Sequence, residues 1–199
     1  MSEGALTDPT LDQQKEALRE RAKALRAKVP QADHAEAARF AAAHFFGAVT
    51  PAPGQIVACY WPIRDEIDSR PVLAELMDSG QPVCLPVVVG EDRPLEMRLW
   101  ELGTMLYPSG FGSLAPGENA PRVEPDILVI PLLGFDGAGT RLGYGRGYYD
   151  RTLAAMSRKP LVVGMAFAIQ QLDFIPRGDH DVPLDIVVTE DGATVFEVS

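Results

Sequence analysis

Cysteine, positive charge and long apolar runs are all scarce in this chain of 199 residues. Its two cysteines, Cys59 and Cys84, stand in apolar surroundings without a Cys-x-x-Cys pair, so we expect buried, reduced thiols. Eighteen lysines and arginines against 28 aspartates and glutamates give a net charge of −10, which argues against nucleic acid as a partner. No apolar run reaches the roughly 20 residues that span a bilayer, and the first residues do not resemble a secretory signal. We therefore expect a cytoplasmic protein with no membrane or nucleic-acid partner.

Apolar stretches alternate along the chain with breaks rich in glycine and proline. The continuously apolar stretch 126–133 indicates a strand that is buried on both faces. The alternation predicts an α/β fold, a three-layer α/β/α sandwich with a mostly parallel sheet. We assign residues 1–10 to a flexible lead and 11–199 to a single domain. The expected helices are 11–28, with Thr10 and Gln13 as a capping box, 32–46, 71–78 and 147–157; the expected strands are 55–61, 82–88, 95–100, 126–133, 161–167, 184–189 and 194–198.

Three polar clusters follow predicted strands, at 64–68, in a glycine-rich loop after residue 133, and at 177–181. Parallel strands present their carboxyl ends at one edge of a sheet, so these clusters should lie on the same edge. The segment 101–125 has many glycines and prolines and little periodicity. It is either a plain surface connection or a loop near a ligand, and its length slightly favours the second interpretation.

The stretch 133–150 is the most informative part of the sequence. It carries two arginines, Arg141 and Arg146, and runs from a predicted strand into a predicted helix. Its alternating glycines are Gly143, Gly145 and Gly147. Glycine allows a positive φ and close approach of a ligand, exposed N–H groups hold anions, and the helix N-terminus adds positive potential. The loop therefore predicts a phosphate site; the plainer alternative is a loose loop whose glycines only satisfy turns.

Neither common nucleotide-binding fingerprint is present. No Walker A sequence occurs, and the glycine-rich loop breaks the dinucleotide pattern at Tyr148. A formal match at 110–115 is followed by Pro116 and Gly117 instead of a helix, so we treat it as chance. A P-loop enzyme or a nicotinamide dehydrogenase is not expected.

The chain resembles the 5-formyltetrahydrofolate cyclo-ligases over nearly its whole length. The most specific element is Gly134-Phe-Asp-x-x-Gly-x-Arg-Leu-Gly-x-Gly-x-Gly-Tyr-Tyr-Asp150, and weaker support comes from Lys15-x-x-x-Arg19, Asp65-Glu66 and the stretch 170–190. The resemblance implies a NagB/RpiA/CoA-transferase-like fold. It also implies ATP-dependent cyclisation of 5-formyltetrahydrofolate to 5,10-methenyltetrahydrofolate, with release of ADP and phosphate, through a phosphorylated formyl intermediate. The expected partners are ATP, 5-formyltetrahydrofolate and Mg²⁺, and a monomer is expected.

The resemblance also assigns site residues. Asp150 and Asp181 match magnesium-binding carboxylates, and Arg141, Arg146 and Tyr148 are the expected catalytic residues. The expected ATP-binding residues are Lys15, Arg19, Arg141, Leu142, Gly143, Tyr144, Gly145, Arg146, Gly147, Tyr148 and Tyr149. The expected folate-binding residues are Trp61, Glu66, Tyr144, Gly145, Arg146, Gly147 and Tyr148.

Several alternatives stay open at the level of sequence. Lys15 and Arg19 could form a solvated helix face, and Asp150, Asp181 and Glu66 could be ordinary turn or surface carboxylates. Arg146 occupies a position where the family usually has glycine or lysine, and the stretch 112–116 departs from the family's pattern, so we assign no site there. The rival functions are a catalytically silent folate-binding or interaction paralogue, and a sugar-phosphate isomerase or acyl-CoA transferase on the same fold. The roles of His180 and Asp185 are left open.

Overall fold

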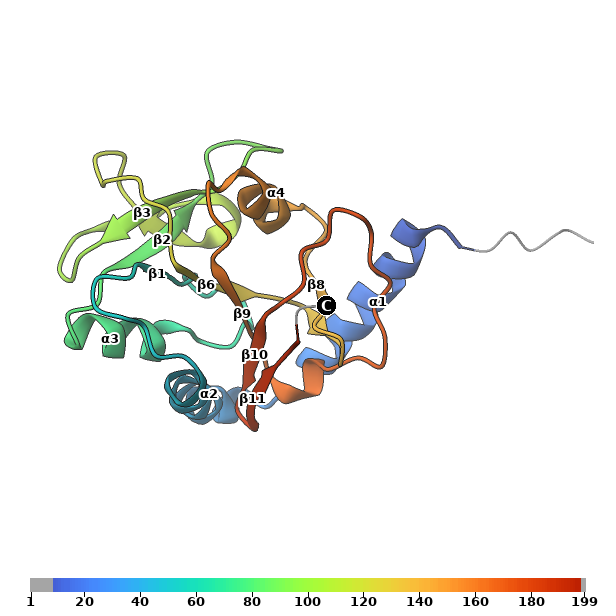
Figure 1. The fold of residues 1–199 in the computed structure, drawn as a ribbon. Helices are drawn as coiled ribbons and strands as arrows, with labels where there is room; N and C mark the ends of the chain where they lie inside the picture. The colour runs from blue at the N-terminus through green and yellow to red at the C-terminus, as the bar shows by residue number, and fades with distance from the viewer. Residues whose placement is uncertain (1–8, 198–199) are drawn as a thin grey trace, which may run out of the picture.

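A seven-stranded sheet forms the centre of the protein (Figure 1), in a computed structural model that describes residues 9–197. The strand order is β11-β10-β9-β6-β1-β2-β3. The strands are β1 (Val57–Ala58), β2 (Val83–Val87), β3 (Glu96–Trp100), β6 (Ile127–Pro131), β9 (Leu161–Met165), β10 (Ile186–Thr189) and β11 (Gly192–Val195). The five central strands pair in parallel, whereas β3 and β11 are antiparallel edge strands. The predicted mostly parallel sheet is confirmed, with antiparallel edges on both sides.

Each central strand contributes side chains to two separate cores. In β6, Ile127 and Val129 face one cluster, and Leu128 and Ile130 face the other. Helices α2 (His34–Ala48) and α3 (Arg70–Asp78) cover the first cluster, and α4 (Tyr148–Ala155) covers the second (Figure 1). Burial of such side chains contributes about 1.5–3 kcal/mol each. The three predicted layers follow from this two-sided burial. In residues 9–197, no helix combines the length and the apolar character that a membrane span requires.

Helix α1 (Leu11–Arg26) packs beside the main sheet. The hydroxyl of Thr10 accepts a hydrogen bond from the Gln13 backbone N–H, and the Gln13 side chain accepts one from the Thr10 N–H, so the predicted capping box is confirmed. Leu18, Ala22 and Leu25 pack against Leu142 and its neighbours in a third apolar cluster. This contact places α1 against the glycine-rich loop. The helix ends two residues earlier than expected, and the assigned lead lies mainly outside the described residues.

Several element boundaries differ from the predictions. β1 is much shorter than 55–61, because the chain leaves the ladder after Cys59 donates to the Cys84 carbonyl and Pro62 offers no N–H. A 3-10 turn (Gln31–Asp33) precedes α2, which continues past Gly47. Both cysteines are free and buried, as expected.

The segment 101–125 is not a plain connection. It folds into a hairpin of β4 (Leu106–Pro108) and β5 (Leu114–Pro116), joined by a 3-10 turn, η2 (Gly110–Gly112). Three residues per strand are too few for the alternating pattern to stand out in sequence. The hairpin packs on β2 and β3 and brings η2 toward the carboxyl end of the sheet.

The connectivity of the sheet places a crevice between β1 and β6. The chain proceeds from β1 outward to β2 on one side, and from β6 outward to β9 on the other. Ligands of open α/β sheets bind outside the carboxyl ends of the strands where the order reverses in this way. The loop after β1 carries Trp61 and Glu66, and the glycine-rich loop follows β6. Two of the three polar clusters that the sequence singles out therefore flank this crevice.

Candidate functional site

A cavity of about 560 Å³ opens at this crevice. Its walls come from α1, the loop after β1, η2, the glycine-rich loop and Asp181. All of the predicted site residues line it: Lys15, Arg19, Trp61, Glu66, Arg141, Leu142, Gly143, Tyr144, Gly145, Arg146, Gly147, Tyr148, Tyr149, Asp150 and Asp181. The fold therefore brings together residues that are up to 166 positions apart, as in the contact of Lys15 with Asp181. Their individual roles stay predictions.

The glycine-rich loop is held by a second, short hairpin of β7 (Gly134–Phe135) and β8 (Arg141–Leu142). The carboxylate of Asp136 is buried at the turn and accepts hydrogen bonds from the backbone N–H groups of Ala138, Thr140 and Ile175. These bonds fix the base of the loop, so Arg141 enters the cavity wall from a rigid support.

The backbone geometry of the loop favours glycine at two positions. Gly145 has a φ of +89°, and a Cβ there would lie 3.0 Å from the guanidinium carbon of Arg19. Gly147 has a φ of +63° and is the N-cap of α4. Side chains are disfavoured at such φ values, so glycine is the favoured residue at both positions. The N-terminus of α4 consequently opens on the cavity with Asp150 in its first turn.

At one end of the cavity, cations pair directly with the predicted metal carboxylates. The Lys15 ammonium bonds to the Asp181 carboxylate, and the Arg141 guanidinium bonds to the Asp150 carboxylate. Arg141 also donates to the Val182 carbonyl, and the Val182 N–H donates to Asp150 at 3.3 Å. We call these four side chains (Lys15, Asp181, Arg141 and Asp150) the charge-paired end of the cavity.

The surroundings at the charge-paired end change the pKa of Asp181 and of Arg141. Burial acts to raise the pKa of Asp181, but hydrogen bonds from Lys15 and the Gly178 N–H, together with nearby positive charge, outweigh it and lower the pKa. Burial lowers the pKa of Arg141, against the opposing charges of Asp150 and Asp181. Arg19 lies beside this end, with its Nε donating to the Gly143 carbonyl at 3.1 Å and its Nη1 to Glu16 at 2.7 Å.

The other end of the cavity is more apolar and holds Trp61 and Glu66. The Trp61 ring packs edge-on to Trp100, with centroids 5.9 Å apart. Glu66 is buried; its Oε2 accepts from the Ile63 N–H at 2.9 Å and its Oε1 from the Tyr144 hydroxyl at 2.8 Å. Burial raises the pKa of Glu66, although these hydrogen bonds and the charge of Arg26 oppose the rise. We call this the buried-carboxylate end.

Two residues that the sequence did not single out contact the predicted site residues: Phe111, which contacts Tyr148, and Arg26, which donates to the Tyr144 hydroxyl. Phe111 in η2 lines the cavity, is about half exposed, and has a φ of +65°. Its ring lies 5.7 Å from that of Tyr148 and 6.0 Å from the Arg146 guanidinium carbon. An aromatic between two glycines in a segment without periodicity was the available signal. Arg26 is the second; it lies seven residues after Arg19 on the same helix, which is two turns and therefore the same face.

Asp185 has a structural explanation. Its carboxylate accepts from the Val162 N–H at 2.8 Å and pairs with Lys159 at 2.9 Å, which anchors the approach to β10 against β9. Arg146 is exposed on the loop, with its guanidinium over the Phe111 ring.

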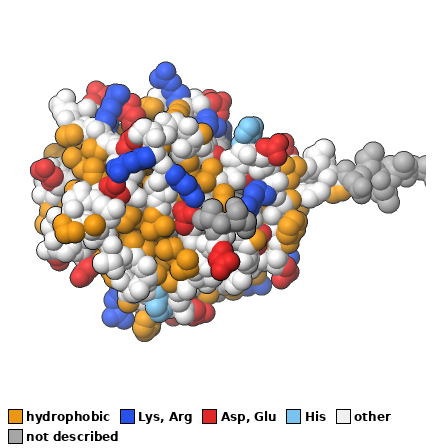
Figure 2. Space-filling model, viewed as in Figure 1, with side chains coloured by type: hydrophobic (Ala, Val, Ile, Leu, Met, Phe, Trp, Pro, Cys, Tyr) orange, Lys and Arg blue, Asp and Glu red, His pale blue; other side chains and the backbone are white. Residues whose placement is uncertain are grey.

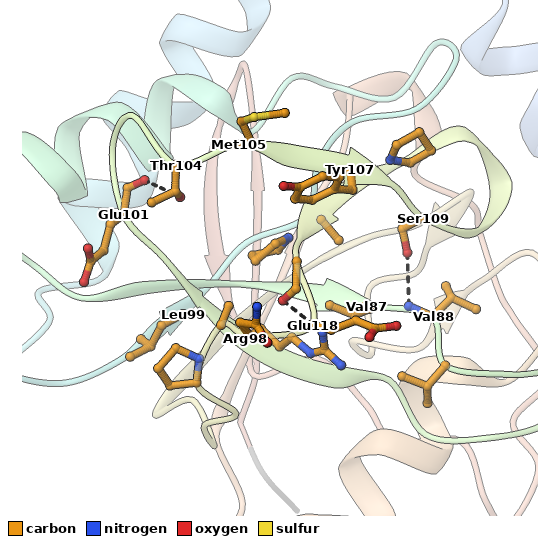
Figure 3. A pocket seen from close by; sticks show the side chains of 18 of the residues that line it. Val87, Val88, Arg98, Leu99, Glu101, Thr104, Met105, Tyr107, Ser109 and Glu118 are labelled. Atoms are coloured by element: carbon orange, nitrogen blue, oxygen red, sulfur yellow. Dashed lines mark hydrogen bonds between the residues drawn. The ribbon is translucent and has the colours of Figure 1, made fainter.

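A larger cavity of about 1020 Å³ lies beside the first and shares Val88 and Gly110 with it. It is enclosed by β2, β3 and the β4–β5 hairpin, with Met105 and Tyr107 on one wall and Leu99 on another (Figure 3). Arg98, which points into this region, is already bonded to Glu96 and to the Gly117 carbonyl. The predicted ligand-binding residues all line the smaller cavity, and none of them lines the larger one.

Surface charge is mixed on the face shown in Figure 2, where lysine and arginine side chains lie among aspartates and glutamates. An anionic ligand would therefore depend on the local cations of the smaller cavity, because the chain as a whole carries a net charge of −10.

The comparisons with known proteins agree on one protein family. The model of the 5-formyltetrahydrofolate cyclo-ligase family matches residues 11–190. The chain is 31% identical to the 5-formyltetrahydrofolate cyclo-ligase of Haemophilus influenzae over 183 residues, covering 88% of this chain and 98% of that protein. The Escherichia coli K12 protein of the same name is 30% identical over 67% of this chain and 76% of its own.

Solved structures agree with this similarity. The 5,10-methenyltetrahydrofolate synthetase of Aquifex aeolicus superimposes with a TM-score of 0.80 at 28% identity, covering 93% of this chain and 94% of that one. The 5,10-methenyltetrahydrofolate synthetase of Mycoplasma pneumoniae gives a TM-score of 0.71 at 24% identity, covering 88% and 98%, and speaks for the fold alone.

Proposed function

The chain belongs to the 5-formyltetrahydrofolate cyclo-ligase family, and from this membership we propose that its smaller cavity catalyses the family's ATP-dependent ring closure. The observation that carries the assignment of the site is the convergence of α1, the loop after β1, the glycine-rich loop and Asp181 on that one cavity. These segments bring cations and carboxylates to one end and an apolar wall with a buried carboxylate to the other. Such a division suits a site that must hold a polyphosphate beside a flat heterocycle.

In this reaction, the formyl oxygen on N5 of 5-formyltetrahydrofolate attacks the γ-phosphorus of ATP, and ADP leaves. The formyl carbon becomes an iminium-type phosphate ester. N10 adds to this carbon, the N10 proton is lost, and expulsion of inorganic phosphate gives 5,10-methenyltetrahydrofolate. The amide-like oxygen is a poor leaving group until it is phosphorylated, which accounts for the use of ATP. The protein's contribution is to position the reactants and to stabilise charge as it moves.

ATP phosphates would bind at the charge-paired end. Lys15, Arg19 and Arg141 supply positive charge there, and the backbone N–H groups around Gly145 and Gly147 supply donors at the start of α4. Arg141 is the best placed to stabilise the transferring phosphoryl group, because it is buried and held by the Val182 carbonyl. Arg146, which is exposed over Phe111, would act at the border between the two ligands.

Asp150 and Asp181 suit a Mg²⁺ ion. Both are carboxylates on the cavity wall, and within residues 9–197 there is no cluster of three or more acidic, histidine or cysteine side chains that would form an all-protein cage. Mg²⁺ typically takes one or two carboxylates and completes its shell with phosphate oxygens and water. When bound, the ion would neutralise phosphate charge and align the transferring group. Lys15 and Arg141, now paired with these carboxylates, would then be free to contact phosphate oxygens.

The folate would occupy the buried-carboxylate end. Trp61 and Tyr148 offer aromatic surface, and Glu66 in its carboxylate form would accept hydrogen bonds from pterin N–H groups. Phe111, which packs against Tyr148, would extend this aromatic wall. We also propose that the protein acts as a monomer in the cytoplasm.

The test is a direct assay with 5-formyltetrahydrofolate and MgATP, following the near-ultraviolet absorbance of the methenyl product together with ADP release. We expect one ADP for each product molecule. A protein that binds the folate but makes no ATP-dependent product would instead be the catalytically silent paralogue. Glu66→Gln tests the site assignment: it should lower kcat/KM for the folate, and unchanged kcat/KM would remove Glu66 from the site.

A further inference from the structure

A buried arginine lies behind the folate end of the site without reaching the cavity wall. Arg26, the last residue of α1, is 3% exposed. Its Nη2 donates to Asp65 at 2.6 Å and its Nη1 donates to the Tyr144 hydroxyl at 2.9 Å. Tyr144 in turn donates to Glu66 at 2.8 Å. The series Asp65–Arg26–Tyr144–Glu66 thus ties α1 to the loop after β1 and to the glycine-rich loop.

This series of hydrogen bonds determines where the hydroxyl proton of Tyr144 points. A guanidinium can only donate hydrogen bonds, so the Tyr144 oxygen must act as acceptor toward Arg26. Its single proton is therefore available to the Glu66 carboxylate, which as an anion can only accept. Glu66 also accepts from the Ile63 N–H. Each carboxylate oxygen has two lone pairs, so both oxygens retain acceptor capacity for a ligand.

Stability is a poor explanation for this arrangement. The Nε of Arg26 is buried and, among the described residues, has no hydrogen-bond partner. A buried charge carries a desolvation cost, and an apolar side chain of similar size is often equally or more stabilising. Arg26 nevertheless stays charged: burial lowers its pKa, but the hydrogen bonds and charges of Tyr144 and Asp65 outweigh burial and raise it.

We propose that Arg26 is a positioning residue of the cyclo-ligase site, which acts through Tyr144 to present Glu66 as an ionised, oriented acceptor for the N–H groups of the folate. This inference rests on the proposed function of Glu66. It distinguishes Arg26 from the cations of the charge-paired end, because Arg26 does not bond to the functional carboxylate itself. A direct ion pair would occupy the oxygens that the folate needs, whereas the relayed contact leaves them available.

The groups that face Glu66 define what should titrate. Arg26 on α1 and Tyr144 in the glycine-rich loop favour its ionised form, whereas burial and the charge of Asp65 oppose it. Tyr60, which follows β1, and Tyr149 of α4 also lie near Glu66. Burial raises the pKa of both phenols, and the charge of Glu66 raises it further. Loss of Arg26 should therefore raise the pKa of Glu66 further and move the acid limb of kcat/KM for the folate to higher pH.

The test compares Arg26→Met, Arg26→Lys, Tyr144→Phe and the Arg26→Met/Tyr144→Phe double variant. Arg21→Met is the matched control, since Arg21 lies on the same helix and its side chain is 59% exposed. Hydrogen bonds to charged groups contribute about 1.5–3 kcal/mol, so Arg26→Met should lower kcat/KM for the folate about 10- to 100-fold and shift its acid limb upward. Arg26→Lys keeps the charge and should leave the acid limb near its original position, with a smaller loss of rate. Arg21→Met should change neither.

Non-additivity is the decisive result. If Arg26 acts through Tyr144, the double variant should be within about twofold of the more impaired single variant. Losses that multiply, or an acid limb that does not move in Arg26→Met, would overturn the proposal, and Tyr144→Phe supplies the comparison if Arg26→Met does not fold. Glu66→Gln distinguishes the role of Arg26 from the role of Glu66. If Glu66→Gln loses rate and the acid limb but Arg26→Met has no effect, only the role of Arg26 is refuted. A fully active Glu66→Gln variant would refute both.

Discussion

The two ends of the cavity use the same residue types in different ways. At the charge-paired end, Lys15 and Arg141 bond directly to Asp181 and Asp150, the carboxylates predicted to bind the metal. At the buried-carboxylate end, the nearest arginine bonds instead to Asp65, and a tyrosine stands between it and Glu66. Direct pairing neutralises a carboxylate until a ligand replaces its partner. Relayed pairing leaves the carboxylate oxygens available to a ligand, and we infer that the first end is suited to exchange and the second to rigid recognition.

The largest expected effect tests whether the charge-paired end holds the metal. Asp150→Asn should lower Mg²⁺-dependent turnover by about 100-fold or more, because changes to partners outside the metal's own ligands already cost about 10- to 100-fold. The fold should persist, since Arg141 keeps its bond to the Val182 carbonyl and its proximity to Asp181. Rates measured across a Mg²⁺ titration, with circular dichroism for the fold, check this expectation.

Asp173→Asn is the control for that variant, because the Asp173 side chain is 94% exposed on the surface. It should match the unmodified protein in rate and in its response to Mg²⁺. Near-normal turnover of Asp150→Asn at ordinary Mg²⁺ concentrations would remove the metal role and, with it, the reason for contrasting the two ends.

A smaller effect is expected at the aromatic wall between the ends. Phe111→Ala should raise KM for the folate about 2- to 10-fold, since an aromatic pair contributes about 0.5–1.5 kcal/mol beyond its burial. Steady-state kinetics with saturating MgATP measure it. Phe174→Ala, at another exposed phenylalanine, should leave KM unchanged. If Phe111→Ala also leaves KM unchanged, the folate lies away from η2.

Sequence predicted the parts of this site that local chemistry determines, and missed those that depend on tertiary contact. The glycine-rich loop could be predicted as a phosphate site because three glycines and two arginines occur together at a strand-to-helix junction. The apolar stretch at 126–133 likewise predicted β6, which begins one residue later and ends two residues earlier than expected. Phe111 and Arg26 carry weaker local signals. Phe111 is an aromatic between two glycines in a three-residue turn, and Arg26 is a helical arginine like its exposed neighbours. Only packing against Tyr148 and Tyr144 distinguishes them.

The backbone at residue 111 offers a further, smaller test of the aromatic wall. A φ of +65° is costly for any residue with a Cβ and free for glycine. Phe111→Gly should therefore be more stable than Phe111→Ala by about 1 kcal/mol, or about 2–4 °C in melting temperature for a chain of this size. Thermal unfolding of the two variants gives the comparison, and equal stabilities would mean that this turn relaxes when the ring is removed.

The smallest effect compares the pH dependence of the two ends. The pKa of Asp181 is lowered below its ordinary value of 3.8, so its pair with Lys15 contributes stability above that pH and loses it as pH falls through the folded-state pKa. The pKa of Glu66 is raised above 4.5, so protonation of Glu66 favours the folded state as pH falls toward that value. The melting temperature of the unmodified protein minus that of Asp181→Asn should therefore fall on acidification. The same difference taken for Glu66→Gln should rise on acidification. The difference for Asp181→Asn should be a few degrees at most, because partly exposed pairs contribute about 0.2–1 kcal/mol. Thermal melts from pH 7 down to about pH 2 include the range below pH 3.8 where Asp181 titrates, and they measure both slopes. Slopes of the same sign would mean that the two carboxylates are held in the same way.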